Sequence, residues 1–395
     1  MSESTSTAFP IELLSRPNEE RADYFYKYKI QHPRLKEADS NLWHAIHTKI
    51  EDTIIFVFGP PGAGKTTLRE GIERRLVREA SLHLTESENM QQVPVLSVEA
   101  PPSERGGFNW KDFFRRSLTE LEHTFTDAID IEPLPSINPR LRPALAFGSR
   151  GPYSEFRIQL EYALRHRKPA TFFIDDAQHI GRITSGYKLQ DQMDVIKFLR
   201  RRSRTVITMI GTYELMALRN LSGQLSRRSI DIHLPRYGTT TEDLKSFQDV
   251  LWTFQKHLPL LIEPDLMKYW EYCYVHSVGC VGILKDWITR SLEDALAEKA
   301  QTINIKILER NALSVERCES IATEALDGEE RLSRRATSSS RLMRMLGFTS
   351  GKTKAKQSDS DSSIESKEND SYNLNPRLPR PVGLRNPKRD KVGKK

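Results

Sequence analysis

Residues 59–66 read Gly-Pro-Pro-Gly-Ala-Gly-Lys-Thr and follow directly on the apolar run Ile54-Ile55-Phe56-Val57-Phe58. This is the complete pattern G-x-x-x-x-G-K-[ST] of a phosphate-binding loop, placed after a predicted strand. The glycines allow a tight turn in which amide N–H groups and the next helix N-terminus point at phosphate. Lys65 is expected to reach the β- and γ-phosphates of ATP, and Thr66 to bind Mg²⁺. A plain Gly/Pro-rich turn would leave the Lys-Thr pair accidental. The predicted nucleotide-binding residues are Gly59, Pro60, Pro61, Gly62, Ala63, Gly64, Lys65, Thr66 and Thr67.

The rest of the chain has the pattern of a layered α/β domain followed by helices. The strand-like runs are Ile54–Phe58, Val93–Val98, Ala170–Ile174 and Thr205–Ile210. Helical stretches separate these runs, an alternation that predicts a mostly parallel sheet covered on both faces. A short amphipathic helix over 35–50 leads into the first strand. Beyond Tyr237 the pattern is helical only, over Thr241–Leu258, Asp265–His276 and Gly279–Lys299.

This pattern divides the chain into four expected regions. They are an N-terminal extension with a linker helix (1–50), an α/β nucleotide-binding core (51–237), a helical lid (238–312) and a mostly disordered basic tail (313–395). Lys65 and Asp175 are 110 residues apart, which is more than a compact core needs. Residues 119–152, which contain five prolines, are therefore predicted to form an insertion.

The net charge of +7 comes from the C-terminal end of the chain. Residues 331–395 hold 17 Lys+Arg against 6 Asp+Glu, whereas the preceding 330 residues are slightly acidic. Few apolar residues are available there to offset chain entropy, which predicts disorder. The segment Pro381–Gly393 combines turn-forming residues with cations and is expected to order on a partner. The alternative is a polybasic segment that only raises the affinity for DNA.

Several classes of protein are disfavoured by the sequence. The first 20 residues lack the basic and apolar regions of a secretory signal. No run approaches 18 consecutive apolar residues, so no membrane-spanning helix is expected. Cys273, Cys280 and Cys318 have neither metal-ligand spacing nor an even disulfide framework. They are interpreted as reduced core thiols of a cytoplasmic protein.

Two carboxylates end the predicted strand Thr171-Phe172-Phe173-Ile174, at Asp175 and Asp176. An ATP-hydrolysing site needs one acid to hold Mg²⁺ and a second to orient the attacking water. We assign Asp175 to the metal and Asp176 to the water. Two acids that cap the next helix would be compatible with this assignment.

Three further positions along the chain suit phosphate chemistry. Thr212 follows the next predicted strand, where its hydroxyl can bond the attacking water or the γ-phosphate; capping of the next helix is the alternative. Arg227 and Arg228 precede another apolar run and can stabilise γ-phosphate charge in an adjacent subunit, or form a plain surface pair. Lys285 flanks the apolar stripe of a lid helix and can reach the nucleotide, although such lysines are commonly solvated.

The order of these features resembles an AAA+ ATPase. More narrowly, His32-Pro33-Arg34-Leu35, Asp175-Asp176-Ala177-Gln178-His179, Gln224-Leu225-Ser226-Arg227-Arg228 and Gly279-Cys280-Val281-Gly282-Ile283-Leu284-Lys285-Asp286-Trp287 are similar to the TnsC/TniB transposition ATPases. The likeness covers roughly residues 25–300. It implies an ATP-dependent regulator that assembles with itself as a ring or filament on duplex DNA. It also implies that the regulator joins a target-selection protein to a transposase, which the C-terminal region engages. Asp176 stands where that family usually has Glu, which bears on the rate of hydrolysis.

The candidates for DNA contact lie on the predicted helix that begins near Trp110. Lys111 and Arg115 share one face at i, i+4 spacing, and Arg116 adjoins them. Such cations would grip phosphates without reading bases. Arg105, in a Gly-rich segment, is a further candidate, and a solvated helix face is the plain alternative.

Two other functions use the same core. One is a motor ATPase for secretion or nucleic-acid remodelling, although the membrane span and envelope-binding module expected of a secretion ATPase are not found in the sequence. The other is a nucleotide-switched scaffold that does not bind DNA. ATPase activity measured with and without duplex DNA separates a DNA-bound regulator from such a scaffold, and a strand-separation assay detects a motor.

Overall fold

The computed structural model describes residues 8–48, 53–82, 92–103, 107–126, 153–182, 189–221, 229–336 and 345–346. The chain divides into two units, Met1–Ser338 and Ser339–Lys395, and every helix and strand below belongs to the first. The strands are β1 (Ile54–Phe58), β2 (Leu96–Glu99), β3 (Thr171–Asp175), β4 (Val206–Gly211) and β5 (Ser229–His233). The helices before β5 are η1 (Ile11–Ser15), α1 (Asn18–Lys27), α2 (Pro33–His47), α3 (Lys65–Leu82), α4 (Trp110–Thr126), α6 (Tyr153–Arg167), η4 (Ala177–Gly181), α7 (Leu189–Ser203) and α8 (Leu215–Arg219). Those after β5 are α10 (Thr241–Lys256), η5 (Met267–Tyr269), α11 (Trp270–Ser277), α12 (Val281–Ala297), α13 (Ile305–Asn311) and α14 (Val315–Ala336).

The five strands form one parallel sheet in the order β2-β3-β4-β1-β5. The predicted α/β fold with a mostly parallel sheet is therefore confirmed, and each of the four strand-like runs contains or overlaps a strand. The run at 229–233, which the sequence analysis treated only as apolar, is a fifth strand that pairs with β1. β1 thus lies inside the sheet with a partner on each edge, and all five of its residues are buried.

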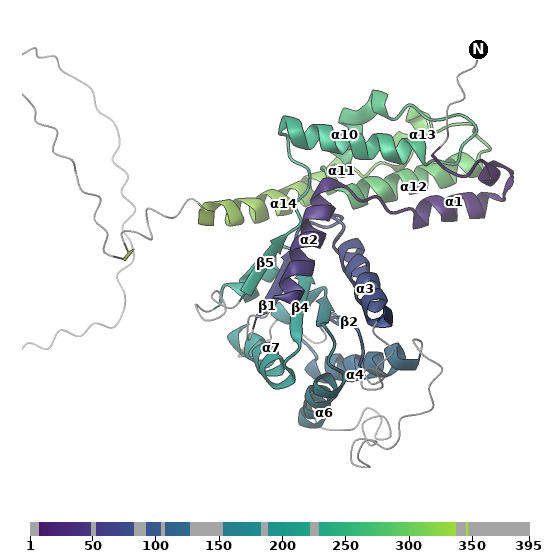
Figure 1. Cartoon of the computed structure of the whole chain (residues 1–395). Coiled ribbons are helices and arrows are strands. Elements are labelled where there is room, and N and C mark those ends of the chain that lie inside the picture. The colour runs from purple at the N-terminus through teal and green to yellow at the C-terminus, as the bar shows by residue number, and fades with distance from the viewer. Residues whose placement is uncertain are drawn as a thin grey trace, which may run out of the picture. The chain divides into compact units, whose positions relative to one another are not determined.

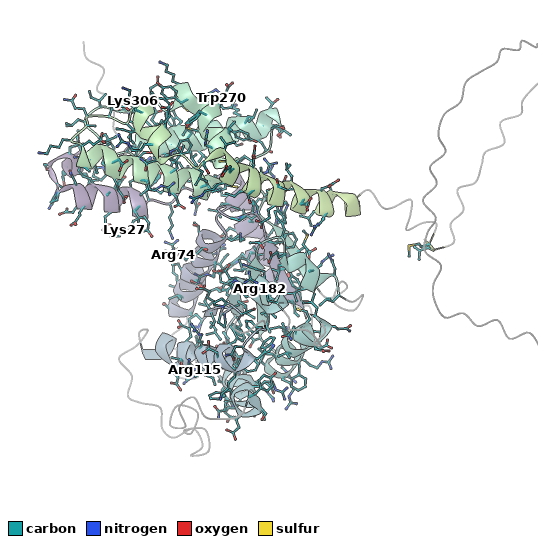
Figure 2. All side chains as sticks on the ribbon, turned by 180° about the vertical axis from the view of Figure 1, so that it is seen from behind. Lys27, Arg74, Arg115, Arg182, Trp270 and Lys306 are labelled. Carbon is teal, nitrogen blue, oxygen red and sulfur yellow. The ribbon has the colours of Figure 1, made fainter. Side chains whose placement is uncertain are left out.

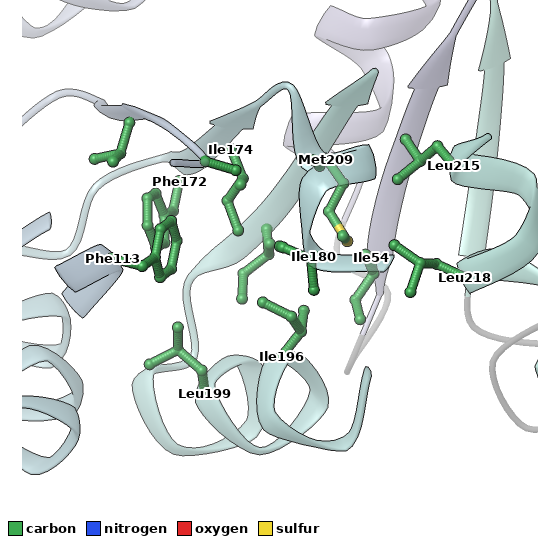
Figure 3. Packing of buried hydrophobic residues seen from close by; sticks show 14 of the residues in the cluster. Ile54, Phe113, Phe172, Ile174, Ile180, Ile196, Leu199, Met209, Leu215 and Leu218 are labelled. Atoms are coloured by element: carbon green, nitrogen blue, oxygen red, sulfur yellow. The ribbon is translucent and has the colours of Figure 1, made fainter. Parts of the chain in front are cut away.

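Helices cover both faces of the sheet because its side chains alternate between two cores. On one face, Ile54, Phe172 and Met209 pack with residues of α4, α6 and α7. Figure 3 shows this packing, in which the rings of Phe113 and Phe172 stack with their centroids 6.0 Å apart. The intervening strand residues face α2 and α3 in a second core, where Ile55 is fully buried. These layers fix the strand ends that carry the phosphate loop and the acids.

The helices after β5 form a lid with its own core, as expected from the helical pattern beyond Tyr237. α10, α11, α12 and α13 bury Phe247, Cys273 and Trp287. α1 also belongs to this core, since Phe25 is fully buried in it and α1 runs beside α12 (Figure 1). The N-terminal extension therefore packs on the lid before α2 leads the chain into the sheet.

The predicted start of the tail at residue 313 is wrong, because α14 is helical over Val315–Ala336. Cys318, Ala325 and Leu332 recur every seven residues, which places them on one face of the helix. Cys318 and Ala325 are buried and Leu332 packs against the sheet core. This seven-residue spacing of apolar residues is present in the sequence and is the signal of a helix that packs on one face.

Two other predictions concern segments that lie mostly outside the described residues. Residues 119–126 continue α4, whereas the remainder of the predicted insertion, 127–152, lies outside the described residues. The tail beyond Ala336 also lies outside them, except for residues 345–346. In the ranges that the structure does describe, no helix has both the length and the apolar character needed to cross a bilayer.

Candidate nucleotide site

Parallel pairing brings the predicted site residues to one edge of the sheet. The phosphate loop follows β1, Asp175 and Asp176 end β3, and Thr212 follows β4. β4 pairs with both β1 and β3, so Thr212 lies between the loop and the two acids along the sheet edge. This is the edge at which ligands bind in open α/β sheets.

The backbone of the phosphate loop adopts conformations that favour glycine. Gly62 has φ +72° and Gly64 has φ +100°, the left-handed region that other residues rarely occupy. The amide of Leu68 donates to the carbonyl of Gly64 (2.9 Å), which joins the loop to the first turn of α3. The free amides of that turn point out of the helix N-terminus, where phosphate binds.

Lys65 folds back over the loop that it follows. Its Nζ donates to the carbonyls of Gly59 (3.0 Å) and Pro60 (2.9 Å). Burial lowers the pKa of Lys65, and the nearby Asp175 and Asp176 carboxylates oppose that shift. The ammonium is thus held over a loop that lacks any acidic residue, so a phosphate anion would gain a partner already in place.

Asp175 is held through both of its carboxylate oxygens. Arg69 Nε donates to Oδ2 (3.0 Å), and the backbone amide of Asp176 donates to Oδ1 (3.0 Å). Arg69 also donates to Glu73 (2.5 Å) and Ser97 (2.7 Å), so its own position is fixed. Burial raises the pKa of Asp175, and the Arg69 guanidinium opposes that shift.

The oxygen donors at this edge are of the kind that Mg²⁺ binds. Among the described residues, no group of three or more His, Cys, Asp or Glu side chains is placed to hold a metal. Mg²⁺ prefers few carboxylates together with phosphate oxygens and water. Asp175 and Thr66 suit that chemistry and would hold the ion there, where it would neutralise phosphate charge.

A glutamine connects the second acid to the end of β4. Asp176 has a left-handed backbone (φ +48°), and its Oδ1 accepts a hydrogen bond from Gln178 Nε2 (3.1 Å). Gln178 Oε1 in turn accepts from the amide of Thr212 (3.3 Å). Gly211 has no side chain to displace that amide oxygen. The proposed base and Thr212 are therefore held in one hydrogen-bonded chain.

The lid contacts the phosphate loop directly. The amide of Gly282, in the first turn of α12, donates to the carbonyl of Gly62 at 2.7 Å. Ile283 lies against the same glycine, because a Cβ built on Gly62 would meet Ile283 Cγ1 at 2.6 Å. The N-terminal turn of α12 thus closes one side of the loop.

Lys285 does not lie at the phosphate loop, contrary to the prediction. Its Nζ donates to the carbonyl of Phe25 and lies 3.3 Å from the centroid of the Phe25 ring. Burial lowers the pKa of Lys285 to about 7. α1 packs on α12 and offers this lysine a carbonyl and an aromatic face, a partner that the spacing within α12 does not reveal.

The DNA-contact candidates that the structure describes all lie on α4. Arg115 and Arg116 each bond Asp112, at 2.8 and 2.7 Å, and are exposed; Figure 2 shows Arg115 on this helix. Lys111 lies 5.8 Å from the centroid of the Phe156 ring.

The basic end of α4 adjoins the nucleotide site. A cavity of about 630 Å³ joins the nucleotide site to this part of α4. Its charged lining residues are Arg69, Glu99, Arg115, Arg116, Glu120 and Asp175. Arg105, Arg227 and Arg228, which were also predicted to bind DNA or phosphate, lie outside the described residues.

Two residues of the site, Arg69 and Gln178, were not among those predicted from the sequence. Arg69 stands four residues after Lys65, so the two share a face of α3, and this spacing is a usable signal. Gln178 stands two residues after Asp176, within a motif that was noted without a role for the glutamine. Both roles depend on partners at the ends of other strands.

Comparison with known proteins gives one family match and several structural similarities. No curated protein matches the sequence. The Aeropyrum pernix ORC1 protein in complex with DNA is 15% identical, covers 75% of this chain and 68% of its own, and has a TM-score of 0.48. The Walker-type ATPase PABY2304 of Pyrococcus abyssi is 12% identical, with coverages of 79% and 80% and a TM-score of 0.45. At these values the similarities say nothing of what this chain binds. Residues 49–219, which contain the phosphate loop, both acids and Thr212, match the family model described as an AAA domain.

Proposed function

We propose that the chain is an ATP-dependent, DNA-binding AAA+ regulator that oligomerises on duplex DNA and links target selection to a transposase. One observation carries the nucleotide part. Lys65 Nζ donates to the carbonyls of Gly59 and Pro60 in the phosphate loop, and Gly282 of the lid closes that loop. The AAA domain match at residues 49–219 supports the same reading.

ATP binding and slow hydrolysis are assigned to residues at the sheet edge. The loop amides and Lys65 bind the β- and γ-phosphates, while Asp175 and Thr66 would hold Mg²⁺. Asp176 accepts a proton from the attacking water, and Gln178 fixes the direction of its carboxylate. Thr212 contacts the water or the γ-phosphate, and its amide is held by the same glutamine.

Duplex DNA is assigned to the exposed side of α4. Arg115 and Arg116 both pair with Asp112, so these three side chains together carry a net positive charge. Surface pairs of this kind are weak and can exchange a carboxylate for a DNA phosphate. The cavity that joins these arginines to Arg69 and Asp175 supports a coupling of DNA contact to the nucleotide site.

The role in transposition rests on the sequence resemblance to the TnsC/TniB ATPases. By that resemblance Arg227 or Arg228 acts on the nucleotide of a neighbouring subunit, and the segment 373–395 recruits the transposase. A deletion of 373–395 is expected to abolish capture of the transposase and to leave ATPase activity intact. Loss of DNA affinity with capture retained would contradict the recruitment role.

ATPase activity with and without duplex DNA tests the function, together with electron microscopy on DNA with a non-hydrolysable ATP analogue. We expect stimulation by DNA and ATP-dependent rings or filaments. ATPase activity that ignores DNA, with no assembly on it, would favour a nucleotide-switched scaffold. Strand separation driven by hydrolysis would favour a motor ATPase.

A further inference from the structure

Helix α14 returns from the lid to the end of the sheet, where it meets the residue after Thr212. Gly328 of α14 lies against the ring of Tyr213, so closely that any added Cβ would clash with the ring carbons. Tyr213 is buried, and its hydroxyl is 2.8 Å from Nε2 of His233 on β5. Burial lowers the pKa of His233 to about 4, which favours the neutral imidazole in this hydrogen bond. α14 is thus seated on the strand ends that carry the nucleotide site.

Glu329, the residue after Gly328, forms an ion pair with Arg236. Arg236 lies in the connection from β5 to α10, and its NH2 donates to Glu329 Oε2 at 3.2 Å. Its Nε lies 3.1 Å from Oε1 but makes no hydrogen bond and is buried. Arg236 is mostly buried, with 13% of its side chain exposed. Arg236 NH1 donates to the carbonyl of Tyr237 at 3.5 Å. The pair therefore lacks the two parallel bonds of a good Arg–carboxylate match and leaves Nε without a hydrogen bond.

The connection that carries Arg236 borders the phosphate loop at Leu234 and the segment before α12 at Tyr237. Gly59, the first residue of the loop, abuts the carbonyl of Leu234, where a side chain would not fit. The amide of Tyr237 donates to the carbonyl of Gly279 (2.9 Å), which leads into the turn of α12 on the loop. Burial raises the pKa of the Cys280 thiol to about 12, and Arg236 and Lys65 both oppose that shift. Arg236 and Lys65 therefore both act electrostatically on Cys280, the residue that follows Gly279.

We propose that Arg236 is a further phosphate-binding residue of the nucleotide site, and that Glu329 of α14 is the carboxylate which a bound nucleotide displaces. The proposal rests on the proposed nucleotide-binding function and extends it to the C-terminal helix. A phosphate group offers three oxygens to a guanidinium that Glu329 leaves partly unsatisfied. Nucleotide binding then weakens the docking of α14, and by linkage the docking of α14 weakens nucleotide binding.

Because nucleotide phosphate and Glu329 compete for Arg236, substitutions of Glu329 and of Arg236 should change the affinity for ATP in opposite directions. In the full-length protein, Glu329→Gln removes the competing charge and should raise the affinity for a fluorescent ATP derivative by about threefold. Arg236→Gln removes the phosphate contact and should lower it by about tenfold, the value of one charge-assisted hydrogen bond. The double variant should bind as Arg236→Gln does, because Glu329 acts only through Arg236.

Asp327→Asn is the matched control for these variants. Asp327 is an exposed acid of the same helix, paired with Arg331 four residues on at 3.2 Å. The Asp327→Asn variant should have the same ATP affinity as the parent protein. Hydrogen exchange gives a second readout: the amides of α14 should exchange faster when ATP is added to the parent protein, and not in Arg236→Gln.

The outcomes separate this inference from the proposed function. A purely structural ion pair would make both single variants bind ATP equally well or equally worse, and either result overturns the inference. So would faster α14 exchange with ATP in the Arg236→Gln variant. A parent protein that binds no ATP would instead overturn the proposed nucleotide function, whatever the variants do.

Discussion

The amide of Gly282 in the lid donates a hydrogen bond of 2.7 Å to the carbonyl of Gly62 in the phosphate loop. A Cβ built on Gly282 would lie 2.6 Å from that oxygen, so the two backbones meet with no side chain between them. The lid therefore contacts the phosphate loop through main-chain atoms, and its position bears directly on the loop conformation.

Gly282→Ala is expected to separate the lid from the loop. The added methyl would force the first turn of α12 away from Gly62, at a cost of about 1–3 kcal/mol in the free energy of unfolding. ATP affinity should fall with it. Gly71→Ala is the matched control, because its Cβ meets only Asp39 at 3.8 Å and it lies inside α3. Unchanged ATP binding in Gly282→Ala, measured by calorimetry, would contradict a role of the lid contact.

Lys65→Ala is expected to abolish ATP binding and, with it, assembly on DNA. The ammonium supplies the charge match to the β- and γ-phosphates, so affinity should fall at least about tenfold. The fold should persist, since burial disfavours this charge in the folded protein. Binding of a fluorescent nucleotide and a thermal melt check the two statements. Parent-like oligomers on DNA with ATP would refute the nucleotide switch.

Asp176→Asn should slow hydrolysis by about 10²–10⁴-fold, the usual contribution of a general base, and leave ATP binding intact. Asparagine retains an oxygen that can accept the bond from Gln178, so the local structure is kept. The assembled state on DNA should last longer. Single-turnover hydrolysis is the measurement, and normal turnover would assign the base to another residue.

Asp175→Asn is expected to weaken the binding of Mg²⁺ rather than the activation of the attacking water. The variant should need more Mg²⁺ for ATP binding and for hydrolysis, because a neutral amide is a poorer ligand than a carboxylate. ATP affinity measured over a range of Mg²⁺ concentrations tests this. Equal Mg²⁺ dependence in variant and parent would remove Asp175 from the metal site.

Local patterns were sufficient to predict the phosphate loop, four strands and both acids. Each of these is encoded within a few residues, by a motif or by an apolar run followed by a polar end. Lys285 was misplaced because its partner, Phe25, is 260 residues away in the sequence. Arg69 was missed because its role depends on Asp175, 106 residues along the chain. Contacts between distant segments follow from strand order and helix packing, which periodicity alone does not fix.

Acid is expected to destabilise the fold between pH 6.5 and 5. Burial lowers the pKa of His32 and of His233 to about 4. The unfolded chain protonates these histidines near pH 6.5, so below that value it binds more protons than the folded chain. Their contribution to stability is full above pH 6.5 and is lost as the pH falls toward 4, by up to about 1.4 kcal/mol per pH unit for each histidine.

Urea unfolding at pH 7, 6 and 5 checks this dependence. His233→Gln should unfold with a midpoint that varies less over this range than that of the parent protein. His44→Gln is the control, since His44 is exposed on α2. A parent midpoint that does not fall between pH 7 and 5 would show that these histidines are not buried in their neutral form.

Replacement of either arginine on α4 should reduce the salt dependence of DNA binding. Arg115→Ala or Arg116→Ala each removes one phosphate contact, which lowers the slope of log affinity against log salt by about 1. Thermal stability should hardly change, because both side chains pair with Asp112 at the surface. Arg74→Ala, an exposed arginine of α3, is the control. An unchanged slope in both variants would move the DNA contact elsewhere.

The path of α14 restricts how the lid can turn. The helix begins against the lid, where Cys318 Sγ lies 3.5 Å from the carbonyl of His276, and ends on the sheet core, where Leu332 packs. Two further connections tie lid to sheet, residues 28–32 and 234–240. An α-helix is stiff along its length, so it cannot act as a slack linker between two bodies. A rotation that opens the nucleotide site must therefore either detach one end of α14 or use its axis as the hinge, and the two cases would give different opening angles.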